Sequence, residues 1–303
     1  MSDDNELGDY LRARRGLVDP TEVGLPGGGV RRTPGLRREE VATLAGISAD
    51  YYLRLEQGRD RNPSGQVLEA LARVLLLDGA ATAYLHGLVA ERGAPRARTR
   101  RASVPAGIRQ LLGTLNLPAF VEDRAFTVLA ANRLATAVSP AIVEGENRLR
   151  SMLLDPREYG MHRERDRAVA GMVATFRASI GPWVDDPSVR ELVGELSLTS
   201  ETFRRLWARH DVREVVGSAS IIDHPEVGEF AFRREKLTIG DADGQLLVIY
   251  HPEPGSPSAQ KLALLGSLHA SDARPLDAAD PAADETGAAE TTDGTTKRLS
   301  PEN

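Results

Sequence analysis

The sequence contains no cysteine in its 303 residues. Disulfides, thiolate metal sites and cysteine nucleophiles are therefore excluded. No apolar run approaches the roughly 20 residues that a membrane-spanning helix needs, and the acidic, polar start is unlike a signal peptide. We therefore expect a cytoplasmic protein without a membrane partner.

Lysine is scarce as well, because 35 of the 38 basic residues are arginine. Arginine suits bidentate contacts with phosphate and guanine, but a GC-rich genome would give the same bias without any function, and that explanation has most of the weight. The net charge of −6 also hides an uneven distribution. Residues 1–101 hold 16 basic against 14 acidic residues, whereas residues 271–303 hold 3 against 8.

The stretch 36–57 contains two short helical patterns separated by Gly46. Their apolar residues recur at helical spacing, and we expect each helix to bury them against a common core: Val41, Leu44 and Ala45, followed by Ile47, Tyr52 and Leu55. Gly46 permits a left-handed turn, Ser48 can cap the second helix and Gly58 can end it. These features predict a helix-turn-helix whose second helix, at about 48–57, enters a DNA major groove, although an ordinary helical hairpin is the alternative. Arginines around both helices favour DNA.

Exposed positions of this motif divide into two classes of predicted DNA contact. The base-reading candidates are Ala49, Asp50, Tyr51 and Arg54, and the phosphate candidates are Arg37, Arg38, Arg59 and Asn62. Arg54 could pair with guanine, Asp50 could accept from a cytosine amino group, and Ala49 leaves room for a thymine methyl. One such helix reads only a few base pairs, so we expect a homodimer on double-stranded DNA.

Further elements are predicted on both sides of this motif. A helix begins at residue 7, a glycine- and proline-rich loop without regular structure covers 19–35, two more helices follow from 63 onwards, and 93–101 is a basic linker. Beyond 105 we expect a short helix, strands at 119–123 and 126–130, and a helix at 132–138. A long helical section comes next, then strands at 215–222, 227–239 and 246–250, and a helix at 258–268. The polar residues 269–303 are expected to be disordered.

Several motifs resemble known families. Residues 7–90 resemble the helix-turn-helix domain of the Xre-like (lambda-repressor-like) regulators through RREEVA (37–42), LAGIS (44–48), YY (51–52) and LEQG (55–58). The chain to about residue 266 resembles the actinobacterial MmyB-like regulators, most specifically through FRRLWARHDV (203–212), HPEVG (224–228) and PGSPS (254–258). The resemblance implies a two-domain fold. Its parts are an all-α domain of five helices at 1–90, a linker at 91–104, an α+β PAS-like sensor domain with an antiparallel sheet at 105–268, and a tail at 269–303.

The same resemblance implies a transcriptional regulator whose sensor domain holds a small apolar ligand, such as a fatty acid, between sheet and helices. The pocket candidates are Met172, Phe176, Trp207, His224 and Phe232. Each of the apolar ones could equally be plain core. The family resemblance also implies an ion pair between Glu56 and Arg14 or Arg15. The alternative is a DNA-binding protein whose large domain serves only dimerisation or protein interaction.

An enzyme is the third hypothesis, and no complete catalytic motif or metal-binding motif supports it. His210 and Asp211 resemble a base with its orienting carboxylate, but neighbours at a helix end point in different directions. We expect His210 instead to cap its helix as an imidazolium, and Asp211 to pair with Arg205 or Arg209. No catalytic residue, metal or other cofactor is predicted.

Overall fold

The computed structural model describes residues 5–26, 35–90, 103–184, 186–213, 219–240, 242 and 244–269. Most of the predicted basic linker, the acidic tail and the centre of the glycine-rich loop lie outside these residues. No helix in the described ranges is long and apolar enough to cross a membrane.

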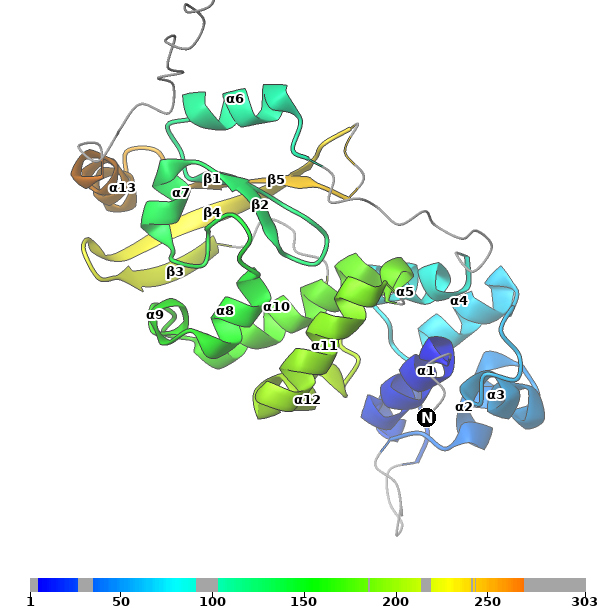
Figure 1. The fold of residues 1–303 in the computed structure, drawn as a ribbon. Helices are drawn as coiled ribbons and strands as arrows, with labels where there is room; N and C mark the ends of the chain where they lie inside the picture. Colours follow the sequence, from blue (N-terminus) through cyan, green and yellow to red (C-terminus); the bar gives the residue numbers. More distant parts are fainter. Residues whose placement is uncertain are drawn as a thin grey trace, which may run out of the picture.

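The N-terminal domain consists of helices around one core (Figure 1). They are α1 (Glu6–Leu17), the 3₁₀ turn η1 (Pro20–Val23), α2 (Arg38–Ala45), α3 (Ala49–Glu56), α4 (Gly65–Val74) and α5 (Gly79–Ala90). Gly46 ends α2 with φ +70°, and the Ser48 hydroxyl accepts a hydrogen bond from the Tyr51 amide at 3.1 Å. The predicted turn between the two helices is thus confirmed.

Two expectations about this domain are wrong. The segment that begins at Asp19 does form regular structure. The Asp19 carboxylate accepts a hydrogen bond from the Thr21 amide at 2.8 Å, and the Glu22 carboxylate accepts one from the Asp19 amide at 3.1 Å. This capping box is completed by a proline at the first position of η1. Leu44 is 40% exposed, because the buried face of α2 runs through Val41 and Ala42.

Helix α1 crosses the end of α3 at Gly8. A Cβ atom built there would lie 2.3 Å from the Glu56 carbonyl oxygen, so any larger residue would push the two helices apart. The Asn5 side chain also donates to that carbonyl at 2.9 Å. The close approach places α1 against the C-terminal end of α3.

The C-terminal domain contains a five-stranded antiparallel sheet with helices on both faces (Figure 1). Strands β1 (Ala119–Glu122), β2 (Val128–Ala131), β3 (Ala219–His224), β4 (Gly228–Thr238) and β5 (Leu246–His251) lie in the order β2-β1-β5-β4-β3. The helices are α6 (Ala106–Thr114), α7 (Arg133–Val138), α8 (Arg148–Leu154), α9 (Pro156–Tyr159), α10 (Arg165–Ile180) with η2 (Gly181–Trp183), α11 (Pro187–Thr199), α12 (Glu201–Trp207) and α13 (Pro257–Leu268). The predicted two-domain fold class is confirmed.

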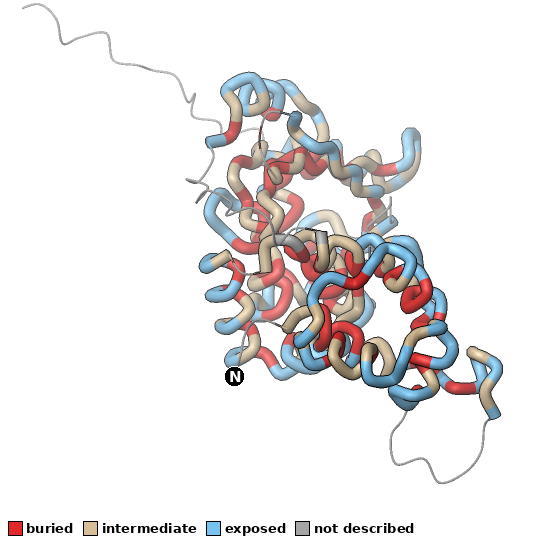
Figure 2. The backbone as a smooth tube through the Cα atoms, turned by 90° about the vertical axis from the view of Figure 1, so that its right-hand side faces the viewer, coloured by how far each residue is buried: buried red, intermediate tan, exposed pale blue. Residues whose placement is uncertain are grey.

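The sheet has two different faces because its side chains alternate. Ala119, Val121 and Leu247 face α6, whereas Phe120 and Val248 belong to the core shared with α7 and α13. Asn132 fixes the start of α7, because its side-chain oxygen accepts from the Ala135 amide at 2.9 Å. In Figure 2, buried residues lie on the sides of the helices that face the interior, and exposed residues lie on the outer sides.

Candidate functional sites

The outward side of α3 carries the four predicted base-reading residues. Ala49 and Asp50 are exposed and Tyr51 and Arg54 are half-buried, while Tyr52 and Leu55 are fully buried beneath them. Arg54 forms an ion pair with Asp50 one turn earlier, and its guanidinium lies 5.6 Å from the centre of the Tyr51 ring. A guanine approaching Arg54 would therefore have to compete with an exposed carboxylate, which is a weak competitor.

The far end of α3 is anchored by a buried carboxylate. Glu56 is 0% exposed and accepts from Arg15 Nε and Arg38 Nε, each at 2.6 Å. Burial alone would raise the pKa of Glu56, but the hydrogen bonds and charges of the two arginines outweigh it, so the pKa lies below its usual range. This confirms the predicted pairing with Arg15, and Arg38 is a second partner from α2.

The predicted phosphate contacts lie on both sides of α3. Arg37, Arg59 and Asn62 are exposed, and Arg37 is the N-cap residue of α2. Arg38 differs from them, because its side chain is 43% exposed and already paired with Glu56. A substitution of Arg38 would therefore disturb the helix packing as well as any phosphate contact.

A cavity of about 750 Å³ lies between the sheet and the helices α8 to α10 of the C-terminal domain. Its lining contains apolar and charged residues in nearly equal numbers, together with Ser139, His162, Gly171, Thr175, Ser220 and Tyr250. The apolar residues are Phe126, Val138, Met152, Met161, Ala168, Met172, Ala219, Ile221, Ile222 and Phe232, the cations are Arg148, Arg163, Arg167, Arg213, Arg234 and Lys236, and the carboxylates are Glu158, Glu164 and Glu229. Its volume is in the range of known small-molecule sites.

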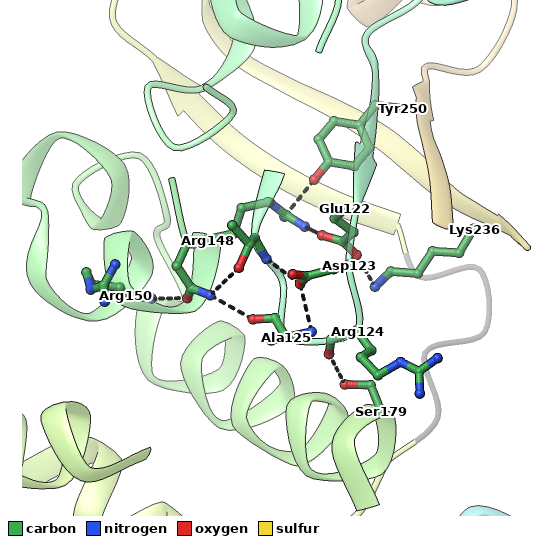
Figure 3. Close-up of polar contacts among 11 residues, drawn as sticks. Glu122, Asp123, Arg124, Ala125, Arg148, Arg150, Ser179, Lys236 and Tyr250 are labelled. Carbon is green, nitrogen blue, oxygen red and sulfur yellow. Dashed lines mark hydrogen bonds and ion pairs between the residues drawn. The ribbon is translucent and has the colours of Figure 1, made fainter. Parts of the chain in front are cut away.

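Two cations of the cavity lining, Arg148 and Lys236, share one buried carboxylate (Figure 3). Glu122 is 0% exposed and accepts from Lys236 Nζ at 2.6 Å and from Arg148 at 2.8 Å. Arg148 also donates to the Tyr250 hydroxyl at 2.8 Å. Burial would raise the pKa of Glu122, but the two cations hold it below its usual range. The carboxylate is therefore ionised and shared.

Residues 104–265 match the family model described as the MmyB-like transcription regulator ligand binding domain. The chain belongs to this family. Residues 6–85 match a second model, described as a helix-turn-helix domain, and no curated protein matches the chain. This MmyB-like protein is thus a DNA-binding transcriptional regulator, and both families indicate a regulator rather than an enzyme.

The five predicted pocket residues of the MmyB-like regulator lie in different places. Met172 and Phe232 line the cavity, whereas Phe176, Trp207 and His224 do not. Phe176 packs between Phe126 and Trp207, with ring centres 5.7 and 5.8 Å away. The His224 ring lies 2.9 Å from the Ala137 carbonyl through Nε2 and accepts from the Glu226 amide through Nδ1, so it holds the β3–β4 turn.

The polar lining residues were missed by sequence reasoning, among them Arg148, Arg234, Lys236 and Tyr250. A signal for two of them exists in β4, where Phe232, Arg234 and Lys236 alternate and therefore share one face of the sheet. Nothing in the sequence indicates that this face borders a cavity, because α8 and α10 cover it from elsewhere in the chain.

The two domains of the regulator are joined by contacts of α10. Arg177 is 1% exposed, donates to the Trp207 carbonyl at 2.7 Å and lies 3.6 Å above the Trp207 ring. The same guanidinium reaches Glu6 of α1 at 3.9 Å. Gly181 lies against the Tyr84 ring of α5, where a Cβ would be only 2.6 Å from the ring. The end of α10 is therefore a docking surface for the helix-turn-helix domain.

The segment 210–213 makes a second connection. Asp211 accepts from Arg209 at 2.9 Å, as predicted, and also from Arg14 of α1 at 3.0 Å. His210 packs edge-on against Tyr10, with ring centres 6.3 Å apart. The predicted imidazolium is wrong, because burial and the charges of Arg177 and Arg14 lower the pKa of His210 to about 3.

The neutral His210 leads to a pH-dependent stability. Its pKa in the folded protein lies below the ordinary value of about 6.5, so the unfolded chain binds the proton more readily and stability falls as the pH drops below 6.5. From pH 7 to pH 5 we expect this group to remove about 2 kcal/mol of the free energy of unfolding. Urea unfolding at both pH values measures it.

His210→Asn is the test variant for this prediction, and His86→Asn is its control. Asparagine tolerates the left-handed φ of +53° at position 210 and does not titrate, so its variant should lose most of the difference between pH 7 and pH 5. His86 is a partly exposed residue of α5 paired with Glu69, and its replacement should leave the difference in place. Equal pH dependence in all three proteins would show that His210 is not the titrating group.

Proposed function

We propose that this MmyB-like regulator binds its operator as a homodimer, and that a small ligand in the cavity of the C-terminal domain changes how the helix-turn-helix domain is held. The ligand is mainly apolar, with a fatty acid as the simplest example, because apolar residues are the largest class in the lining and the volume is about 750 Å³. We propose Ala49, Asp50, Tyr51 and Arg54 as the base-reading residues.

The observation that supports regulation is that two segments border both the cavity and the docked domain. Helix α10 lines the cavity at Ala168, Gly171, Met172 and Thr175, and one turn or two later it contacts α1 and α5. Arg213 lines the cavity three residues after His210, and its amide donates to Ala174 of α10 at 3.3 Å. A ligand that shifts either segment would act on the position of α1.

The first test is mass spectrometry of an organic extract of the purified full-length protein. We expect a small apolar molecule at close to one equivalent. Gly171→Phe is the matched variant, because it replaces a cavity-lining helical glycine and would occupy the space with an aromatic ring. The molecule should be absent or strongly reduced in that extract. Clean extracts from both proteins, also after exposure to a lipid mixture, would favour the dimerisation or protein-interaction role.

The second test concerns DNA. A site is selected from random duplexes with the full-length protein, and Arg54→Ala is then compared with Arg37→Ala by fluorescence anisotropy. Arg54→Ala should lose about 1–3 kcal/mol on the selected site and little on random DNA. Arg37→Ala should weaken both alike and reduce the salt dependence by about one unit. Equal losses of Arg54→Ala on both duplexes would contradict its assignment to a base.

A further inference from the structure

Helix α3 presents Arg54 from a backbone that is fixed from both sides. Its first turn is held by the Ser48 hydroxyl, which accepts a hydrogen bond from the Tyr51 amide at 3.1 Å. Tyr52 and Leu55 anchor the inward side of the helix, each with 0% exposure. The freedom that remains at this position is therefore that of the long Arg54 side chain itself.

Two neighbours on the outer surface of α3 restrict that side chain. Asp50, one turn earlier, forms an ion pair with Nη1 of Arg54. An acidic residue four positions before a basic one is the favourable order for a pair on a helix. The centre of the Tyr51 ring lies 5.6 Å from the guanidinium carbon of Arg54, which is within the range of a cation–π contact. Together these contacts limit the conformations of Arg54 before DNA arrives.

The ion pair leaves one edge of the guanidinium for DNA. Arginine has five N–H donors in one plane, and Asp50 binds only at Nη1 of Arg54. In the described ranges, Nε and Nη2 of Arg54 have no hydrogen-bond partner. Two parallel donors of this kind match O6 and N7 of guanine in the major groove. The pair thus directs a guanine-reading edge away from the carboxylate.

Asp50 also places a negative charge on the surface that DNA approaches. Its side chain is 74% exposed, so its charge is directed at solvent and at any nearby phosphate. Repulsion of phosphate weakens complexes with every sequence. The orientation of Arg54, by contrast, helps only those sequences that have guanine at the right place. A carboxylate at this position therefore lowers affinity and raises specificity.

We propose that Asp50 is a positioning residue. It holds Nη1 of Arg54 so that Nε and Nη2 meet O6 and N7 of one guanine of the operator, and it acts on the base only through Arg54. The inference rests on the proposed function, because it assigns separate roles to two of the base-reading residues. Without the carboxylate, Arg54 is free to bind phosphates, which every sequence offers. The loss then falls on the discrimination between sequences.

The experiment uses the full-length protein and its selected duplex, in which each guanine is replaced in turn by 7-deazaguanine. This base lacks the N7 acceptor and keeps its Watson–Crick pairing. Fluorescence anisotropy gives the affinities for the selected, substituted and random duplexes. With the natural protein, one of the substitutions should weaken binding about fivefold. With Arg54→Ala the same substitution should have little effect, because the contact to N7 is already lost.

Asp50→Ala and Glu39→Ala separate positioning from charge. Glu39 is an exposed acidic residue in the first turn of α2. Each variant removes one negative charge, so each should raise the affinity for random DNA about twofold. Only Asp50→Ala should lower the ratio of selected to random affinity, by about fourfold, and reduce the effect of 7-deazaguanine. Asp50→Glu still reaches Arg54 and should restore most of that ratio. Circular dichroism checks that each variant is folded.

Three results would overturn the inference in distinguishable ways. If Asp50→Ala leaves the ratio unchanged, as Glu39→Ala should, Asp50 acts only through its charge. If Asp50→Ala lowers the ratio while the full effect of 7-deazaguanine persists, Asp50 contacts another base directly. In both cases Arg54 remains the reader of guanine. If no 7-deazaguanine weakens binding, or if Arg54→Ala retains the full effect, the proposed base-reading role of Arg54 fails as well.

Discussion

Glu56→Gln should lower the free energy of unfolding of the helix-turn-helix domain by about 3 kcal/mol. The substitution keeps the shape of the side chain but removes the negative charge that Arg15 and Arg38 share. Arg15 is only 12% exposed, so its charge would remain poorly solvated, whereas Arg38 at 43% can turn to water and limits the loss. Urea unfolding followed by circular dichroism measures the change.

Asp50→Asn is the matched control for this prediction. Asp50 also belongs to α3 and also pairs with an arginine, but its side chain is 74% exposed. Its removal should change the free energy of unfolding by less than about 0.5 kcal/mol. If both variants lost equally little, Glu56 would not be the residue that ties α1, α2 and α3 together.

Arg177→Met should cost about 3 kcal/mol and loosen the docking of the two domains. The variant removes the side-chain donor to the Trp207 carbonyl, which keeps only the bond from the His210 amide, and it loses the stacking of the guanidinium on the Trp207 ring. It also removes the cation next to Glu6 of α1. Methionine fills a similar volume, so the loss reports the polar contacts rather than an empty space. Urea unfolding gives its size.

Arg205→Met serves as the control, because Arg205 is an exposed arginine of α12. It should change stability by less than about 0.5 kcal/mol. The operator affinity of each variant, measured with and without the extracted ligand, then separates docking from stability. If the ligand changed DNA binding in Arg177→Met as much as in the natural protein, the coupling would not pass through the end of α10.

The local structure of the helix-turn-helix could be predicted from sequence, because its signals lie within a few residues of one another. Gly46 and Ser48 define the turn by their own backbone and side-chain chemistry, and the buried face of α3 follows from helical spacing. The Glu56–Arg15 pair came from the family resemblance. Its second partner, Arg38, did not, because an exposed-looking arginine at a helix start suits a phosphate equally well.

The cavity was harder to predict, because its lining comes from distant elements. Phe176 and Trp207 are large and apolar, as pocket residues often are, but each finds its partners in neighbouring helices. Arg234 and Lys236 have ordinary surface character until α8 and α10 cover their side of the sheet. His210 was misjudged for the same reason, since its pKa is lowered by burial and by the charges of Arg177 in α10 and Arg14 in α1, which lie far from it in the sequence.

The contact between Tyr84 and Gly181 has a consequence for biosynthesis. Helix α5 leaves the ribosome long before residue 181 does, so the side of α5 that this contact buries has no cover while the second domain is still being made. Tyr84 and Tyr10, which form one aromatic pair at 5.1 Å, border that side and are almost completely buried in the finished protein. This side of the first domain is therefore buried only after the second domain has emerged. Until then it is an exposed hydrophobic surface that chaperones and other nascent chains can bind.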